Sequence, residues 1–489
     1  MRVNLLAIPA VLILCTGTAA EPTRVVLKEG DVLGPPGHVI ASVSSVATNG
    51  VGGFGIALNT NTPGGPTATL TSHILATTTA GVAQPAAPVI VHVEGVVGPY
   101  TFTGFEGEFG ISDTGDIAYG VTATSGGFTG LDAVFLGSTP LAVQRDVAPP
   151  FSPQFWSFAS RIRMTNNGVP YWKSGVTNTA GGATVNRTIV RGNPAVKITA
   201  GGDVLTNLPT ALDLTPASTL FTYRLSAQGN HAVTFEVLDA VPTTTDGVVV
   251  VDGAGLLLDG QLVREGSPVP AAVGGRNAEN WVNFEEFGIT ESNRLFIFGD
   301  TSATTATDDF MLADGVMRLR DGDTVDGQVF EGDIEEAFVN ETADHAIIWD
   351  TAVNTIETLL VNRRIVLKEG DTLDLDGDGT PEPTSVISGL GGTAGIALTQ
   401  RIGGLLRAYV VANVDVNGTT STADDLGTAV EISICLPDIN RSGTVTVQDI
   451  FDYLTLYFSS DLDADYNNSF TVTVQDIFDF LAGYFTGCV

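Results

Sequence analysis

An eight-residue segment near the start of this chain returns near its end. Residues Arg24-Val-Val-Leu-Lys-Glu-Gly-Asp31 reappear as Arg364-Ile-Val-Leu-Lys-Glu-Gly-Asp371, and weaker copies stand at 261–266 and 318–323. We call each copy a head. A chain with internal repeats is expected to fold as a series of similar units, because each unit buries its hydrophobic face only against a neighbouring unit.

A second pattern follows the heads. Residues 109–117 (FGISDTGDI) match residues 287–295 (FGITESNRL), and 162–168 and 225–231 are similar. Each copy consists of an alternating strand, a turn rich in Asn, Gly or Asp, and another alternating strand. Such turn residues accept the positive φ of two-residue hairpin turns, so the pattern predicts β-hairpins.

The spacing of the heads predicts the architecture. They recur about seven times, at intervals of roughly 45 to 75 residues, which leaves room for four short strands in each interval. We therefore expect a β-propeller-like repeat domain of about seven blades over residues 21–430. A β-sandwich array and a β-helix are the alternatives. The 57 Gly, the many Thr and Val, and the charged fraction of only 16% also favour a mainly β fold. The two ends of the repeat, with their matching heads, are expected to meet where the ring closes.

Charge and the first residues indicate the compartment. The formal net charge of −33 repels phosphate backbones and argues against nucleic-acid binding. Residues 1–20 look like a signal peptide, with Arg2 before an apolar run and small residues at 18–20. That run is too short to span a bilayer, and we expect no transmembrane segment in the mature chain. The protein is predicted to be secreted or displayed on the cell surface.

Two cysteines follow the signal peptide, Cys435 and Cys488. An even pair in an exported chain predicts a disulfide. The two residues also mark the limits of a separate C-terminal module, which we place at residues 431–489.

This module contains a second, nearly exact duplication. Residues 444–458 recur 27 residues later as 471–485, with 12 of 15 positions identical. Apolar residues at helical spacing in both copies predict two short amphipathic helices that pack face to face. The residues expected at their interface are Ile450, Phe451, Leu454, Phe458, Ile477, Phe478, Leu481 and Phe485.

A calcium-loop pattern precedes each predicted helix. Calcium takes six to eight hard oxygen ligands, and alternate residues of a tightly coiled loop supply them at positions 1, 3, 5, 7 and 12. In the first loop these positions hold Asp438, Asn440, Ser442, Thr444 and Asp449. In the second they hold Asp465, Asn467, Ser469, Thr471 and Asp476. The alternative is a plain Asx-turn before a helix N-cap.

The loops differ at position 6, where a sharp turn is needed. The first loop has Gly443 there and the second has Phe470. A bulky residue at this place must adopt a strained left-handed conformation or distort the loop. The second loop is therefore expected to bind calcium weakly or to serve only in packing.

Paired loop–helix units of this kind, bounded by cysteines and ending in Gly487-Cys488, resemble a GC-type, type I-like dockerin. The resemblance covers residues 435–489 and departs from the pattern at Phe470. It implies calcium-dependent folding and docking onto a cohesin-like protein or a cell-surface receptor. By the same resemblance, partner recognition falls to loop positions 10 and 11, which are Val447, Gln448, Val474 and Gln475.

One further calcium candidate lies in the repeat domain. Asp374, Asp376 and Asp378 precede Gly379, with Glu382 nearby, directly after the last head. The first head has no such insertion, so the run is interpreted as an added calcium-binding hairpin.

No catalytic motif stands out, and no catalytic residue is assigned. The five histidines are scattered, and neither a nucleophile elbow nor a phosphate-binding loop occurs. The repeat region is similar to uncharacterised β-propeller-like repeats upstream of dockerins, which implies no known chemistry. We favour an exported, non-catalytic protein with a binding or structural β-repeat domain. The alternatives are a dockerin-borne polysaccharide-degrading enzyme, either a glycoside hydrolase or a lyase, and a calcium-stabilised matrix component. A polysaccharide is a possible ligand in the first two cases.

Overall fold

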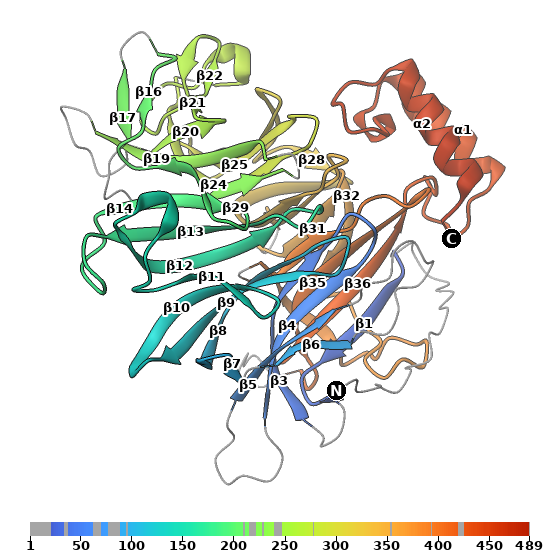
Figure 1. The fold of residues 1–489 in the computed structure, drawn as a ribbon. Helices are drawn as coiled ribbons and strands as arrows, with labels where there is room; N and C mark the ends of the chain where they lie inside the picture. The colour runs from blue at the N-terminus through green and yellow to red at the C-terminus, as the bar shows by residue number, and fades with distance from the viewer. Residues whose placement is uncertain are drawn as a thin grey trace. The chain divides into compact units, whose positions relative to one another are not determined.

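The protein is described here from a computed structural model (Figure 1). The structure describes residues 21–33, 38–61, 70–76, 89–93, 96–208, 211–214, 222–226, 229–238, 247–276, 278–352, 355–392, 394–418 and 425–488. The predicted signal peptide, residues 1–20, lies outside the described residues. The chain divides into two compact units, one at 1–70, 75–90 and 323–489 and the other at 71–74 and 91–322. Among the described residues, no helix is long and apolar enough to cross a bilayer.

Three antiparallel sheets lie mainly in the first unit, with strand orders β2-β3-β4-β5-β6, β28-β29-β30-β31-β32 and β1-β36-β35-β33, and with β34 paired to β35. The strands are β1 (Thr23–Lys28), β2 (Val32–Leu33), β3 (His38–Thr48), β4 (Phe54–Asn61), β5 (Leu70–Ala76), β6 (Val89–Val93), β28 (Thr324–Val325), β29 (Gln328–Val339), β30 (His345–Thr351), β31 (Glu357–Val361), β32 (Arg364–Lys368), β33 (Val386–Leu390), β34 (Ile396–Leu398), β35 (Leu405–Asp415) and β36 (Leu426–Cys435).

Four antiparallel sheets of four to six strands belong to the second unit, in the orders β11-β10-β9-β8-β7, β12-β13-β14-β15, β16-β17-β19-β20-β21 with β18 paired to β19, and β24-β25-β26-β27. The strands are β7 (Val96–Val97), β8 (Tyr100–Ile111), β9 (Ile117–Ser125), β10 (Phe128–Leu136), β11 (Thr139–Val143), β12 (Phe155–Met164), β13 (Pro170–Thr177), β14 (Asn186–Arg191), β15 (Val196–Ala200), β16 (Val204–Leu205), β17 (Leu212–Leu214), β18 (Tyr223–Leu225), β19 (His231–Leu238), β20 (Gly247–Val251), β21 (Ala254–Gly255), β24 (Trp281–Ile289), β25 (Leu295–Thr301), β26 (Asp309–Ala313) and β27 (Val316–Arg320). A two-stranded ribbon pairs β22 (Leu257–Leu258) with β23 (Gln261–Leu262).

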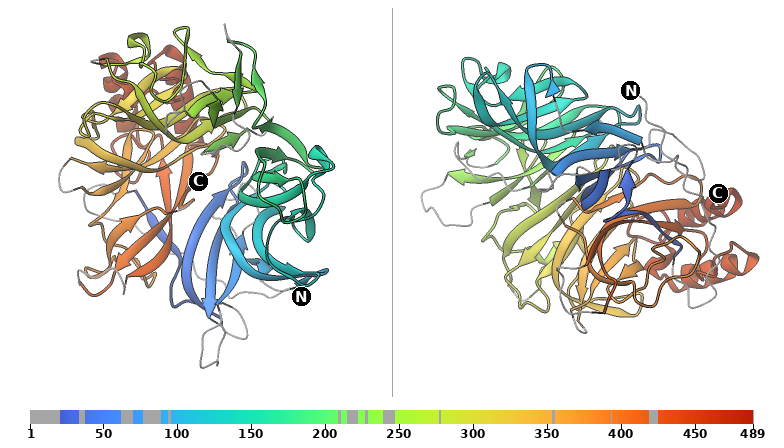
Figure 2. Two further views of the ribbon diagram at one scale, coloured as in Figure 1. Left: turned by 90° about the vertical axis from the view of Figure 1, so that its left-hand side faces the viewer. Right: turned by 90° about the horizontal axis from the view of Figure 1, so that it is seen from below.

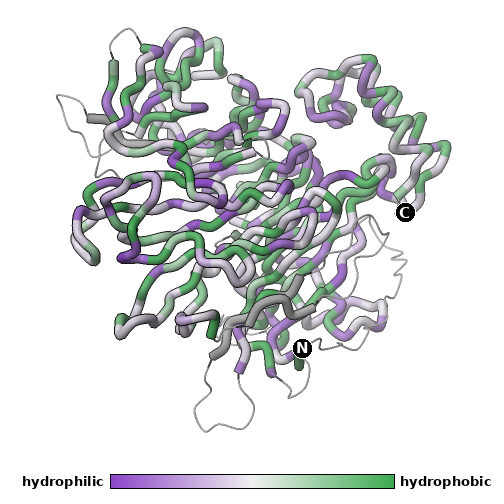
Figure 3. The backbone as a smooth tube through the Cα atoms, in the orientation of Figure 1, coloured by the Kyte–Doolittle hydropathy of each residue, from purple (hydrophilic) through white to green (hydrophobic). Residues whose placement is uncertain are grey.

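Seven antiparallel sheets of four to six strands thus follow one another along the described chain, which is the blade pattern of a seven-bladed β-propeller. The predictions of a mainly β fold and of about seven blades are confirmed. A β-helix is excluded for the described sheets, since all of their strand pairs are antiparallel. Hydrophobic and hydrophilic positions alternate along many strands, as the colours of Figure 3 show.

The first strand completes the last sheet of the chain. β1 lies antiparallel to β36, with Thr23 opposite Ile432 and Lys28 opposite Thr428 (Figure 1). Matching heads were expected to mark the place where the two ends of the repeat meet. The first head contains most of β1 and the last head contains β32, so the two heads lie in different sheets. The two ends of the repeat domain are joined by the pairing of β1 with β36.

The heads are corner turns between one sheet and the next. In the first head, Asp31 receives a hydrogen bond on its side chain from the Lys28 N–H (2.9 Å), and the Gly30 N–H donates to the Ile40 carbonyl (3.0 Å). The last head repeats both contacts at Asp371 and Gly370. Both glycines have φ near +85°, a conformation that explains Gly in the motif.

The acidic residue that directly precedes the glycine of the head has a separate role. Glu265 accepts the Gly247 N–H (2.9 Å), and Glu369 accepts the Glu357 N–H (3.1 Å). Each carboxylate therefore pairs a backbone donor at the start of the neighbouring strand, and an unpaired buried N–H is costly.

The second sequence pattern forms hairpins, as predicted, but with longer turns. The ladder between β8 and β9 ends at the pair Ile111 and Ile117, which leaves five residues in the turn. The Ser112 N–H donates to the Asp116 carbonyl (2.9 Å), and the Ser112 hydroxyl accepts the Asp116 N–H (3.0 Å). The hydroxyl closes the wider turn, so a two-residue turn is not needed.

Two helices follow the last strand, α1 (Val447–Ser459) and α2 (Val474–Thr486) (Figure 2). Within the described part of the chain, three short 3-10 turns also occur, at Pro149–Phe151, Ala271–Val273 and Leu462–Ala464. Both helices begin with a capping box, in which Thr446 or Thr473 exchanges hydrogen bonds with the aspartate three residues later. The duplicated cap explains why the duplicated sequences become helical at the same residue.

Loss of a head carboxylate should weaken the repeat domain. We expect Glu265→Ala to lower the melting temperature, because the Gly247 N–H loses its acceptor at a buried position, at a cost of about 1–3 kcal/mol. Glu265→Gln keeps an acceptor oxygen and should lose less. Calorimetry of the full chain would measure both, and an unchanged melting temperature in the alanine variant would contradict the role given to the head.

Candidate functional site

The first predicted calcium loop brings its oxygens together. The Asp438 carboxylate is buried and accepts the N–H groups of Ser442 (3.0 Å) and Gly443 (2.7 Å). The Ser442 hydroxyl lies 3.1 Å from the Thr444 carbonyl oxygen, and Asp449 is completely buried. Burial, together with the Asp449 carboxylate, raises the pKa of Asp438. Two buried carboxylates with converging hydroxyl, amide and carbonyl oxygens fit the donor set that calcium prefers.

The second loop has the same geometry. Asp465 accepts the N–H groups of Ser469 and Phe470, and the Asn467 N–H donates to Asp476 (3.2 Å) as Asn440 does to Asp449. Burial, with the charge of Asp476, raises the pKa of Asp465 to about 6. Thr471 provides its carbonyl oxygen to the Ser469 hydroxyl (3.0 Å).

Phe470 takes the left-handed conformation that the sequence required, with φ of +60°. The loop around it is not distorted, since its hydrogen bonds match those of the first loop. The Phe470 ring is buried and lies 6.0 Å from the ring of His345, at the start of β30. Packing against the β domain therefore offsets the strain of a side chain at this position.

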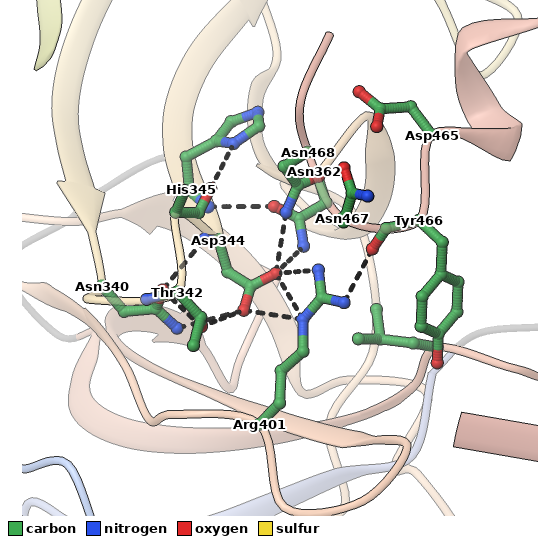
Figure 4. Close-up of polar contacts among 12 residues, drawn as sticks. Asn340, Thr342, Asp344, His345, Asn362, Arg401, Asp465, Tyr466, Asn467 and Asn468 are labelled. Atoms are coloured by element: carbon green, nitrogen blue, oxygen red, sulfur yellow. Dashed lines mark hydrogen bonds and ion pairs between the residues drawn. The ribbon is translucent and has the colours of Figure 1, made fainter. Parts of the chain in front are cut away.

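The second loop also forms the polar contact between the module and the repeat domain (Figure 4). Its centre is Asp344, a completely buried residue that ends the turn between β29 and β30. Asp344 forms an ion pair with Arg401 and accepts a hydrogen bond from the Asn468 amide (2.9 Å). Arg401 in turn donates to the Tyr466 carbonyl (2.7 Å).

The electrostatics of this contact favour the charged forms. Burial alone would raise the pKa of Asp344, but Arg401 and hydrogen bonds from Thr342 and Asn362 hold it below the usual value. The turn residue Asn340 adds a further donor to the same carboxylate (3.2 Å). A buried ion pair of this kind fixes geometry, because removing one partner leaves an uncompensated charge.

Other contacts join the same surfaces. Arg363 pairs with Asp463 (3.2 Å), Arg441 pairs with Asp326 (2.7 Å), and Arg364 donates to the Leu436 carbonyl (2.9 Å). The module is thus held to the sheet of β28–β32 by both of its loops and by the segment that leads into them.

The disulfide prediction is confirmed. Cys435 and Cys488 are bonded, with their Cα atoms 5.5 Å apart. The bond joins the end of β36 to the residue that follows α2 by two positions.

The helices pack face to face, but four of the residues expected at the interface are on the outside. Tyr453 and Phe480 stack at 4.0 Å in the core of the module, with Ile450, Leu456, Tyr457, Ile477, Leu481 and Tyr484 around them. Phe451, Phe458, Phe478 and Phe485 are instead 59–79% exposed. The buried loop residues Asp449 and Asp476 fix the rotation of each helix, and the positions four residues later turn inward.

The exposed residues form one stripe on each helix. Val447 is 61% exposed and lies on the same face as Phe451 and Phe458, and α2 repeats the arrangement at Val474, Phe478 and Phe485. We call these two sets the apolar stripes. Figure 3 marks hydrophobic positions along both helices. The predicted recognition residues Gln448 and Gln475 are also exposed, next to the stripes. The exposed phenylalanines were missed because each follows another large apolar residue, Ile or Tyr, and such a pair offers two adjacent candidates for one buried position.

The third predicted site forms the expected turn, but one of the three carboxylates that lie close together differs from the prediction. Asp374 accepts the N–H groups of Gly377 and Gly379, and Asp378 accepts that of Thr380. The carboxylate oxygens that lie within 4.8 Å of one another come from Asp374, Asp376 and Glu382. Glu382 reaches the loop because it lies across the turn from Leu375.

Comparisons with known proteins give similarity of fold only at a distance. No family model and no curated protein matches this chain. A β-propeller domain of the trilobed protease from Pyrococcus furiosus is 8% identical, with a TM-score of 0.37, and the match covers 79% of this chain and 96% of that one. A protein of unknown function from Bacteroides caccae is 9% identical (TM-score 0.30, 64% and 92% covered). An α-L-arabinanase from Penicillium chrysogenum is 10% identical (TM-score 0.32, 85% and 98% covered).

Removing the central carboxylate should detach the module. We expect Asp344→Ala to lower the melting temperature, with a loss of about 3–5 kcal/mol, because Arg401 stays partly buried without its partner. Asp344→Asn keeps several hydrogen bonds and should lose less. Limited proteolysis near residues 436–438 would report detachment, and wild-type resistance in the alanine variant would contradict the contact.

The disulfide should stabilise the module. Cys488→Ser opens a loop with a sequence separation of 53 residues, and the chain-entropy model gives a loss of about 4 kcal/mol. We expect the helical circular dichroism signal of the full chain to be lost at a lower temperature than in the wild type. Wild-type chain treated with a reductant is the matched control and should behave like the variant.

Proposed function

We propose that this chain is an exported, non-catalytic attachment protein. Its β-propeller presents a binding or structural surface, and its C-terminal loop–helix module, a dockerin-like unit, joins it to a cohesin-like partner in a calcium-dependent way. The observation that carries the proposal is the pair of apolar stripes, six large apolar residues that are 59–79% exposed on two short helices. Large apolar side chains gathered in this way mark interaction surfaces.

The position of the stripes supports a separate partner. The module contacts the repeat domain through the second loop, at Tyr466, Asn468 and Phe470, and through Arg441 of the first loop. The stripes remain exposed in the folded chain. Aromatic residues in such patches often carry much of the binding energy at protein interfaces. The two stripes have the same residue types at the same spacing, so the module would offer two equivalent half-sites.

Calcium would act on the shape of this surface. The loop residues Asp449 and Asp476 are also the N3 residues of the capping boxes that start α1 and α2. A calcium ion held by Asp438 and Asp449, with Asn440 and Ser442, would therefore fix the start and the rotation of α1. Asp465 and Asp476 would do the same for α2. The run at Asp374, Asp376 and Glu382 is proposed as a third calcium-binding hairpin, separate from the docking surface.

The test is binding of the full chain to purified cohesin domains from the genome that encodes it, measured by surface plasmon resonance. We expect binding in calcium and none in chelator. Phe451→Ser combined with Phe478→Ser should weaken binding at least tenfold, because both half-sites lose a central aromatic residue. Val196→Ser, at an exposed apolar residue of β15, is the control and should bind like the wild type. Unchanged binding by the double variant would overturn the assignment of the stripes.

The two loops can be compared in the same assay. The hydrogen bonds of the loops match, and we therefore expect Asp438→Ala and Asp465→Ala each to remove about one calcium ion per chain in calorimetric titration. Loss of an ion in the first variant alone would mean that Phe470 disables the second loop. Loss in neither would remove calcium from the proposal.

A further inference from the structure

Three carboxylates converge in the sheet of β24–β27, outside every site described above. Oxygen atoms of Asp308, Asp309 and Asp321 lie within 4.8 Å of one another. Asp309 is the first residue of β26, and Asp321 follows the last residue of β27. Asp309 and Asp321 are buried and Asp308 is half-buried, so the group opens to solvent on the side of Asp308.

The carboxylate of Asp309 has no counterpart of opposite charge. It is 6% exposed, among the described residues no hydrogen bond or ion pair is formed with its carboxylate, and the charges that act on it most strongly are all negative. Burial comes first among the causes that raise its pKa to about 9, and Asp321, Glu285, Asp300 and Asp308 follow. A buried carboxylate surrounded by four others is an arrangement that requires compensation.

Arg320, one of the two arginines on β27, is already occupied. Arg320 donates to both oxygens of Glu279, each at 2.7 Å, and to the Thr307 carbonyl (2.7 Å). Its side chain is buried in that pairing. The charge of Arg320 is therefore balanced by Glu279.

The repeats of the chain show that the sheet itself does not need this carboxylate. Asp321 is the acidic residue of its head and accepts the Asp309 N–H (3.2 Å), as Glu265 accepts the N–H of Gly247. Gly247 fills this place without any side chain. Glu357 has the equivalent place beside Glu369, but its carboxylate accepts the Leu390 N–H. Of Gly247, Glu357 and Asp309, only Asp309 has a carboxylate at this position that accepts no hydrogen bond.

We infer that Asp308, Asp309 and Asp321 bind a divalent metal ion, and that calcium is the ion. Carboxylate oxygens are hard ligands, and calcium accepts an irregular set of them completed by water. Asp308 is half-buried and follows a segment that contains the exposed residues Ser302, Thr304 and Thr305, so water can reach the cluster from this side. The ion neutralises the buried charge and ties the start of β26 to the end of β27.

Calcium titration of the full chain after chelator treatment tests the site. Asp309→Asn is nearly isosteric and removes repulsion, so it should fold and melt no lower than the wild type in chelator. It should bind one calcium ion fewer per chain than the wild type, and its melting temperature should rise less on addition of calcium. Asp259→Asn, at an exposed turn of the same unit, removes the same charge and should keep the wild-type number of ions.

Two outcomes would overturn the inference. The first is an equal number of bound ions and an equal calcium-induced rise in melting temperature in wild type and Asp309→Asn. The second is terbium luminescence, excited through Trp281, that is the same in both proteins, since Trp281 packs against Phe310 (5.2 Å) beside the site. Either result would mean that the cluster holds no metal. Neither depends on the C-terminal loops, because Asp309→Asn leaves them intact.

Discussion

The structure of the first unit depends on the pairing of β1 with β36. This antiparallel ladder supplies the backbone partners of the strand that leads directly to Cys435. The Ser433 N–H donates to the Pro22 carbonyl, just before β1, and Arg364 donates to the Leu436 carbonyl, just after β36. The first strand, the last head and the base of the C-terminal module are thereby held at one place. Backbone groups that are buried must be paired, so the start of the chain is needed to complete its final sheet.

The same requirement explains the repeats. Each head turn pairs its own backbone groups and sends a carboxylate to a donor in the neighbouring strand. The distinctive features of the molecule are side chains that are added to this repeated geometry. One hairpin turn ends in Asp344, which anchors the module, and one head stands beside Asp309, where the proposed ion would bind.

The C-terminal module combines an attachment surface with an anchored base. Phe470, in a left-handed conformation, and Asn468 commit the second loop to the repeat domain. The apolar stripes stay exposed, so a partner that binds them is held at a fixed position relative to the last sheets of the first unit. A freely linked module would instead leave the attached domain to move on its tether.

The sequence by itself determined the units of this protein. Strand alternation, head turns and the duplicated cap depend on neighbours only a few residues away, and they predicted the mainly β fold, about seven blades, two helices and the disulfide. Tertiary structure decided which side of each helix is buried, because an Ile-Phe pair satisfies helical periodicity in two rotations and only the buried Asp449 and Asp476 select one. It also decided the partners of Asp344 and Glu382 and the neighbours of Asp309. Those contacts join residues that are distant in sequence, and no local sequence pattern predicts which buried charged groups lie next to each other.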